Sequence, residues 1–194
     1  MRIPGQATAL QTLSTEEKRR AIRPVPEQQA ELELKTYYEQ VRRTFGFMPN
    51  YFLTQGRIPE LVDAQLRIRE VIMKDGALSA AIKGQIALVV SGINTPSYCV
   101  AIHLELLRPL GIEKPLGRIL ATDYGRAPVG DAVRALFRFA DKLTRKEADI
   151  CQADIDAVYA AGWDQAALFE TVLVVSLMNF ANRFAIGCGL MADF

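Results

Sequence analysis

The sequence has few of the residues on which metal sites and disulfide-stabilised folds depend. Its 194 residues include one histidine, three cysteines and one tryptophan. Cys99, Cys151 and Cys188 are odd in number and widely spaced, so they predict reduced thiols rather than a disulfide framework. A single histidine without paired cysteines also argues against a zinc site. We therefore expect no metal, no cofactor and a cytoplasmic location.

Charge of one sign and long apolar runs are also missing. The 23 basic and 22 acidic residues give a net charge of +1, and no basic block stands out. This balance argues against nucleic acid or an anionic membrane as a partner. No segment reaches the ~18 uninterrupted apolar residues of a membrane helix. Residues 1–20 lack the apolar core of a secretion signal, so we expect no export and no membrane association.

What is present is the composition of a globular helical protein. Half of the residues are hydrophobic and 23% are charged, which is typical of a chain with a sizeable core. Apolar residues recur at helical spacing, and no stretch alternates with the period of a strand. We therefore expect an all-α fold, with residues 1–25 as an N-terminal arm and residues 26–194 as a single helical domain.

Start and stop signals divide this domain into helices. Ser79 and Asp131 are suited to cap helices, and Gly46 is suited to end one. The segment 47–52 is predicted to be an aromatic turn, which either plugs the core or lines an apolar pocket. The predicted helices cover residues 27–45, 59–76, 80–93, 96–107, 115–123, 131–143, 150–161 and 164–191.

The most distinctive chemistry of the chain lies around its single histidine. Thr95 and Pro96 suit the N-cap and first position of a helix, which places Cys99 in its first turn. His103 follows one turn later on the same face. The positive end of the helix dipole favours a thiolate, and an imidazole can take up or return the proton. A buried structural cysteine beside a core histidine would show the same spacing, because free cysteine is often a small core residue.

Three segments together are similar to one known family. They are Ser91-Gly92-Ile93-Asn94 with the following Ser97-Tyr98-Cys99-Val100-Ala101-Ile102-His103, the aromatic segment 45–52, and Asn179-Phe180-Ala181-Asn182-Arg183. They resemble the carboxymuconolactone decarboxylase family, and within it the alkylhydroperoxidase-D-like, peroxidase-related branch. The resemblance implies a helical bundle with a weak internal repeat that assembles as a dimer, trimer or hexamer.

The resemblance also implies roles for particular residues. In this family the second cysteine of a Cys-x-x-Cys motif attacks peroxide, and a histidine relays the proton. These positions correspond to Cys99 and His103. Supporting positions of the same motif correspond to Tyr98, Gln85, Ser91 and Asn94.

Two family positions are changed in this chain. The first cysteine of the motif corresponds to Pro96, and the relay glutamate corresponds to Gly84. Gln85 lies beside Gly84, but an amide cannot relay protons as a carboxylate does. The resemblance therefore implies a thiol peroxidase with a single reactive cysteine, an antioxidant activity of the peroxiredoxin type. Its partners would be a small hydroperoxide and an external thiol reductant, unless Cys151 or Cys188 resolves the oxidised thiol.

Two other readings stay open. A member of the family whose redox chemistry has decayed would persist as a small-ligand-binding or structural oligomer. A lactone decarboxylase would use His103 for proton transfer without a thiol. The role of Arg183 also has two alternatives: it makes a structural ion pair, or it neutralises an anionic substrate.

An internal echo supports the implied repeat. Leu88-Val89-Val90-Ser91 recurs as Leu173-Val174-Val175-Ser176, and Asn94 recurs as Asn179 at the same offset. The segment 164–191 is apolar with few charges, so we expect it to be buried in the domain or between subunits.

Overall fold

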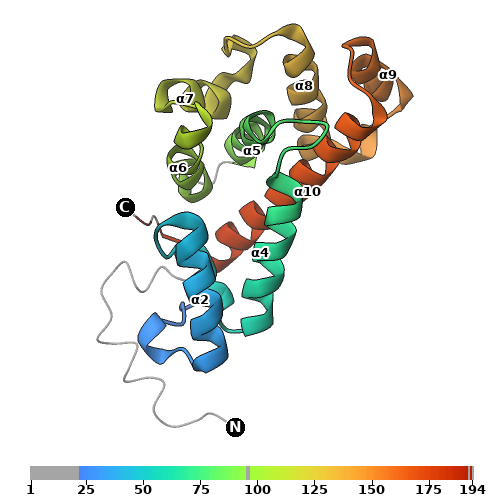
Figure 1. Ribbon diagram of the computed structural model, residues 1–194. Coiled ribbons are helices and arrows are strands. Elements are labelled where there is room, and N and C mark those ends of the chain that lie inside the picture. The colour runs from blue at the N-terminus through green and yellow to red at the C-terminus, as the bar shows by residue number, and fades with distance from the viewer. Residues whose placement is uncertain (1–21, 95–96, 192, 194) are drawn as a thin grey trace.

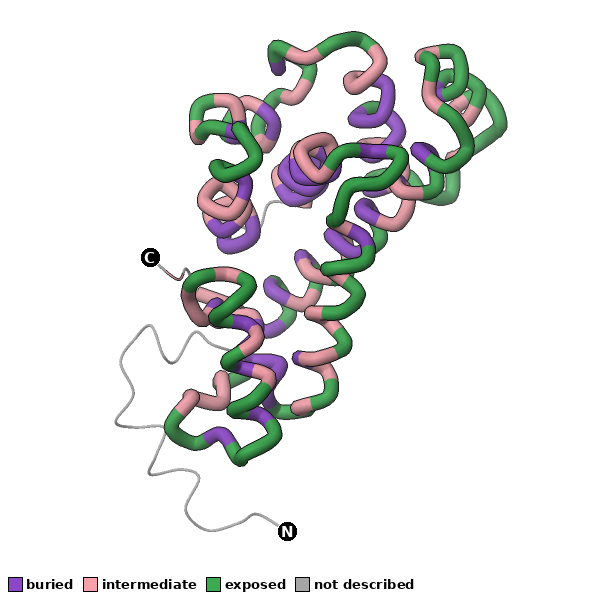
Figure 2. Tube along the Cα trace, viewed as in Figure 1, coloured by how far each residue is buried: buried purple, intermediate pink, exposed green. Residues whose placement is uncertain are grey.

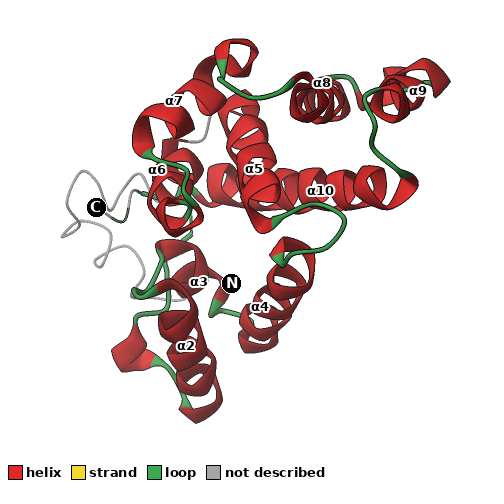
Figure 3. Ribbon diagram, turned by 45° about the horizontal axis from the view of Figure 1, so that its top comes forward, coloured by secondary structure: helices red, strands yellow, loops and turns green. Residues whose placement is uncertain are grey.

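The computed structural model describes residues 22–94, 97–191 and 193. Within these ranges the chain forms nine α-helices and several short 3-10 helices, without a strand (Figure 3). The all-α prediction is confirmed. Most of the predicted N-terminal arm lies outside the described residues, whereas Val25 donates a backbone hydrogen bond to Leu53 at 2.8 Å.

The helices fall into an N-terminal group and a longer C-terminal series. The first group consists of α2 (Leu32–Phe45), α3 (Asn50–Gln55) and α4 (Pro59–Met73). The remaining helices are α5 (Ala80–Asn94), α6 (Ser97–Leu106), α7 (Lys114–Asp123), α8 (Asp131–Arg145), α9 (Gln152–Ala160) and α10 (Gln165–Cys188).

Helices α5 and α10 form the centre of the fold. Almost every residue of α5 from Lys83 to Ser91 is buried, because α7, α8 and α10 all pack against it (Figures 1 and 2). Helix α10 extends from α8 and α9 at its beginning to the N-terminal helices near its end (Figure 1). By length and hydropathy α10 could cross a membrane, but its buried side chains pack in this core, which accounts for its apolar character.

The two copies of the sequence echo pack against each other. Asn94 near the end of α5 donates from Nδ2 to Oδ1 of Asn179 in α10 at 2.9 Å. Leu88 and Val174, one from each copy, are both completely buried in the main core. The repeated pattern therefore marks the two helices that form the centre of the molecule.

Several local helix signals act as the sequence predicts. Gly46 ends α2 with φ of 77°, a left-handed conformation that glycine adopts without steric cost. Ser79 accepts a hydrogen bond from the backbone N–H of Ile82 at 3.3 Å, as expected of an N-cap.

Two expectations about local structure were wrong, and one cannot be placed. Asp131 was expected to be the N-cap of α8. The N-cap is Gly130, and Asp131 is the first helical residue. The aromatic turn predicted at 47–52 is partly the helix α3, because the chain turns at Pro49 and then resumes helical hydrogen bonding. Thr95 and Pro96, the predicted start of the Cys99 helix, lie outside the described residues.

The predicted homo-oligomer stays a prediction. Three large apolar side chains of α10, namely Phe169, Phe180 and Ile186, are exposed on a single chain. They are the surface that such an assembly would cover.

Candidate functional site

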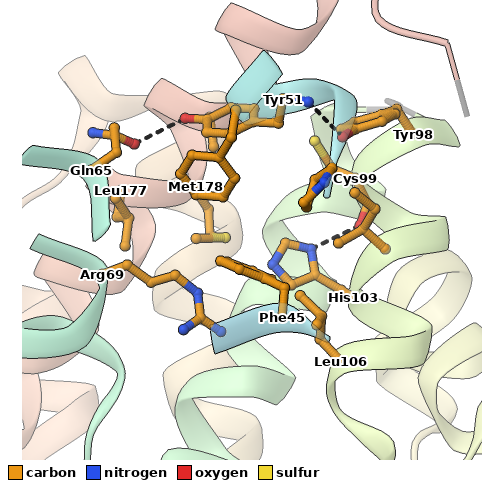
Figure 4. A pocket seen from close by; sticks show the side chains of 14 residues that line it. Phe45, Tyr51, Gln65, Arg69, Tyr98, Cys99, His103, Leu106, Leu177 and Met178 are labelled. Carbon is orange, nitrogen blue, oxygen red and sulfur yellow. Dashed lines mark hydrogen bonds between the residues drawn. The ribbon is translucent and has the colours of Figure 1, made fainter. Parts of the chain in front are cut away.

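A small cavity separates α6 from the N-terminal helices and α10 (Figure 4). Its volume is about 80 Å³, which exceeds the space that a few water molecules need. Cys99 and His103 both line it, as the sequence spacing predicts for one helical face. The other walls are mainly aromatic and aliphatic, and they include Phe45, Tyr51, Tyr98 and Met178.

The Cys99 thiol is kept neutral by its surroundings. Only 5% of Cys99 is exposed, and burial raises the pKa of its thiol to about 11, although a hydrogen bond from Asn182 lowers it in part. A helix N-terminus contributes only about 0.3–1 kcal/mol toward the thiolate. Loss of hydration shifts a pKa by up to about 3–5 units. Burial therefore outweighs the dipole, and the thiolate expected from the sequence is not the resting state.

Asn182 connects Cys99 with two of the supporting residues. It is completely buried, and its Nδ2 donates to Ser91 Oγ at 3.3 Å. Its Oδ1 accepts from Asn94 Nδ2 at 3.0 Å. Ser91 and Asn94 thus lie in one amide network that orients Asn182 toward the thiol. Local sequence spacing does not connect Asn182 with the thiol, although Asn182 lies in the segment 179–183 that resembles the family.

The position of the His103 ring determines its tautomer. Nδ1 lies 2.8 Å from the carbonyl oxygen of Cys99, one turn earlier in α6 (Figure 4). A carbonyl oxygen can only accept, so Nδ1 carries the hydrogen and Nε2 holds a free lone pair. Burial lowers the pKa of His103 to about 4, and the positive charge of Arg69 adds to that shift. The imidazole is therefore a neutral base at pH 7 in the wall of the cavity.

The remaining predicted site residues are divided between the cavity and the core. Tyr98 lines the cavity, and its hydroxyl oxygen accepts a hydrogen bond from the backbone N–H of Tyr51 at 3.0 Å. Gln85 is not among the cavity residues, and its buried Oε1 has no hydrogen-bond partner among the described residues. A Cβ added to Gly84 would press on the side chain of Leu107. The position of the family's glutamate is therefore filled by helix packing.

The two other cysteines do not line the cavity. Cys151 is exposed at the start of α9, where it caps the helix together with Asp154. Cys188 is buried at the end of α10. Among the described residues, Cys99 is the only thiol that lines the cavity. The described part of the chain also contains no group of three or more histidine, cysteine or acidic side chains that could hold a metal.

We expect the reactivity of Cys99 to rise steeply with pH. Because its pKa is raised to about 11, its labelling by iodoacetamide should accelerate about tenfold per pH unit from pH 7 to 10. Mass spectrometry of timed samples follows the Cys99 peptide. In denaturant the labelling rate of the same peptide should be half-maximal near pH ~8.5, the ordinary thiol pKa, and level off above that pH. A plateau below pH 8 in the folded protein would contradict a thiol kept neutral by burial.

The architecture has clear counterparts among solved structures. An uncharacterized peroxidase-related protein from Silicibacter sp. TM1040 is 26% identical, with a TM-score of 0.83 over 93% of this chain and 95% of its own. An alkylhydroperoxidase AhpD core from Ralstonia eutropha JMP134, also peroxidase-related, is 25% identical, with a TM-score of 0.80 over 88% of this chain and 91% of its own.

A third structure shares the fold at lower identity. The debrominase Bmp8, solved as a Cys-to-Ala variant with 2,3,4-tribromopyrrole, is 19% identical, with a TM-score of 0.76 over 89% of this chain and 91% of its own. At that identity the likeness is one of fold alone. No family model and no curated protein matches the sequence.

Proposed function

We propose that this chain, which shares its fold with peroxidase-related and alkylhydroperoxidase-D-like proteins, is a thiol oxidoreductase that reduces a small organic hydroperoxide at Cys99. One observation carries the proposal: the thiol of Cys99 and the neutral imidazole of His103 line the same small cavity. The apolar lining favours an organic hydroperoxide, whose hydrocarbon part loses its hydration on entry.

The first step oxidises the thiol by two electrons. As the sulfur of Cys99 attacks the distal oxygen of the hydroperoxide, its proton passes to Nε2 of His103 in the same event, because pKa values of about 11 and about 4 disfavour a separate ion pair. The S–O bond forms as the O–O bond breaks, which leaves a sulfenic acid and an alkoxide. The alkoxide receives the proton from His103 and leaves as the alcohol. The neutral imidazole is restored at the end of the step.

The second step requires a thiol from outside the cavity. An external thiol attacks the sulfenic sulfur of Cys99, releases water and forms a mixed disulfide. A second thiol molecule then attacks this disulfide, which restores Cys99 and yields the reductant's own disulfide. Cys151 is exposed on α9, and Cys188, although close enough to Tyr51 to raise its pKa, does not line the cavity, so we assign this step to an external reductant.

The proposal is tested with tert-butyl hydroperoxide and a small dithiol as reductant. The wild type should consume the hydroperoxide, and dimedone should trap a sulfenic acid on the Cys99 peptide, because this thiol is the reacting group. Cys99→Ser should lose both signals, to the rate of the reagents alone. Cys151→Ser is the matched control and should keep both. Consumption that persists in Cys99→Ser would refute the assignment.

A second candidate function is favoured by the state of the thiol. Burial raises the pKa of Cys99 to about 11, as expected for a thiol that only packs against a ligand. In that case the protein binds a small apolar molecule without redox chemistry. The same experiment separates the two, because a binder would be stabilised by a ligand yet yield no dimedone adduct at Cys99.

A further inference from the structure

Arg69 brings a positive charge into the wall of the cavity. It belongs to α4 and lines the cavity together with His103 and Cys99 (Figure 4). Its Cζ lies 4.8 Å from the centre of the Phe45 ring, so the guanidinium stands against an aromatic face. Burial lowers the pKa of Arg69, which reflects the cost of holding this charge away from water.

The guanidinium of Arg69 has no polar partner in the described part of the chain. Arg42, Arg67, Arg134 and Arg145 donate to carboxylates or backbone carbonyls. The other arginines of these ranges that lack such a partner are exposed to solvent, whereas Arg69 is not. Among the described arginines, Arg69 alone is partly buried and without a hydrogen-bond acceptor.

An unpaired guanidinium in an apolar setting is energetically unfavourable. Its N–H donors lose their water without gaining acceptors, and the ring of Phe45 compensates the charge only in part. The lining of the cavity contains no aspartate or glutamate that could pair with it. Such an arrangement is typical of a site where the missing acceptor belongs to a ligand.

From this unpaired cation in an apolar cavity, we propose that the site takes small molecules with a carboxylate attached to an apolar body. The carboxylate would accept two parallel hydrogen bonds from Arg69, and the apolar body would contact Phe45 and Met178. This inference rests on the proposed function, because it takes the cavity to be the substrate site. It narrows the substrate to a carboxylate-bearing hydroperoxide.

The outer side of Arg69 reaches the surface of the molecule. Arg69 also lines a hollow on the surface, together with Arg43, Arg67 and Glu70. Arg67 is paired with Asp63, and Arg43 donates to the carbonyl oxygen of Glu39 at 3.4 Å. Arg69 is thus the shared wall between this hollow and the thiol cavity.

The proposal is tested by calorimetric binding of benzoate and of benzamide, its neutral counterpart of similar shape. Near pH 7 the wild type should bind benzoate about 10- to 100-fold more tightly than benzamide, the usual worth of a hydrogen bond to a charged group. Arg69→Gln should reduce benzoate affinity by a similar factor and leave benzamide unchanged. Arg67→Gln, on the same helix, is the matched control and should leave both affinities unchanged.

The proposal can still be tested if Arg69→Gln folds poorly. The two ligands are compared on the wild type itself, and equal affinities there would overturn the proposal. Arg69→Lys keeps the charge without the planar fork, so it should bind benzoate with intermediate affinity. Full benzoate affinity in a folded Arg69→Gln protein would also overturn the proposal.

Failure of this inference can be told apart from failure of the proposed function. If Cys99 is oxidised by tert-butyl hydroperoxide but benzoate shows no preference over benzamide, the carboxylate site is refuted and the peroxidase stands. If benzoate binds through Arg69 but Cys99 forms no sulfenic acid, the peroxidase is refuted and the carboxylate site stands. Benzoate should also slow Cys99 oxidation in the wild type, and should not do so in Arg69→Gln.

Discussion

We expect His103→Gln to slow the oxidation of Cys99 by hydroperoxide by about 10²–10⁴-fold, the usual worth of a positioned acid–base group. The thiol of Cys99 is neutral in the folded protein, because burial raises its pKa to about 11. The reaction therefore needs a base at the moment of attack. The free Nε2 of His103 is the nitrogen base that the cavity supplies. Glutamine fills a similar volume and can still donate to the Cys99 carbonyl, but it cannot take up a proton.

The measurement is the rate of sulfenic acid formation at Cys99, together with thermal unfolding of the same variant. Ile102→Val is a matched control, since Ile102 also lines the cavity from α6 but has no titratable group. It should keep the rate within a small factor and lose about 0.5–1.5 kcal/mol of stability. A His103→Gln protein that loses stability but keeps its rate would show that the histidine is structural.

We expect Gly92→Ala to be the most destabilising small change in this fold. A Cβ built on Gly92 would overlap the carbonyl oxygen of Ala121, where α5 crosses α7. The obstacle is backbone rather than a flexible side chain, so the two helices must move apart. Overpacking of this kind costs about 3 kcal/mol. In a protein of this size that corresponds to a fall in melting temperature of roughly 6–12 °C.

Gly187→Ala provides the matched control for that prediction. Gly187 is also helical, but nothing lies within 4 Å of the position of its Cβ. Alanine should therefore stabilise α10 slightly, by up to about 1 kcal/mol, because it loses less backbone entropy on folding. Thermal unfolding followed by circular dichroism measures both variants. Equal melting temperatures for the two would contradict the close approach of α5 and α7.

Much of the reactive pair could be predicted from the sequence, and part of its environment could not. Cys99 and His103 are four positions apart, and helical geometry alone puts them on one face. Asn182 and Arg69 come from other helices, so no local spacing connects them with the thiol. Asn182 could have been suspected from the family segment that contains it. No sequence pattern marked Arg69 as a cavity residue, because an arginine on the solvated face of an amphipathic helix has the same sequence context.

The repeat of Leu88–Ser91 as Leu173–Ser176 could be read in part from the sequence and in part only from the structure. The sequence showed that two apolar helices share a pattern, but not that they would touch. The structure pairs them through Asn94 and Asn179, which occupy equivalent places in the two copies. The amide of Asn94 at the end of α5 and that of Asn179 within α10 are hydrogen-bonded to each other, as buried polar groups in a core require.

The sequence by itself determined the helices, the apolar character of α5 and α10, and the shared face of Cys99 and His103, because these follow from periodicity and local spacing. The tertiary structure decided the charge state of the site. Whether a thiol ionises depends on how much water the packed helices exclude, and that exclusion raises the pKa of Cys99 to about 11 and lowers that of His103 to about 4. It also decided that Arg69 is held in the cavity wall without a partner, since desolvation and pairing are properties of the packed chain and not of any one segment.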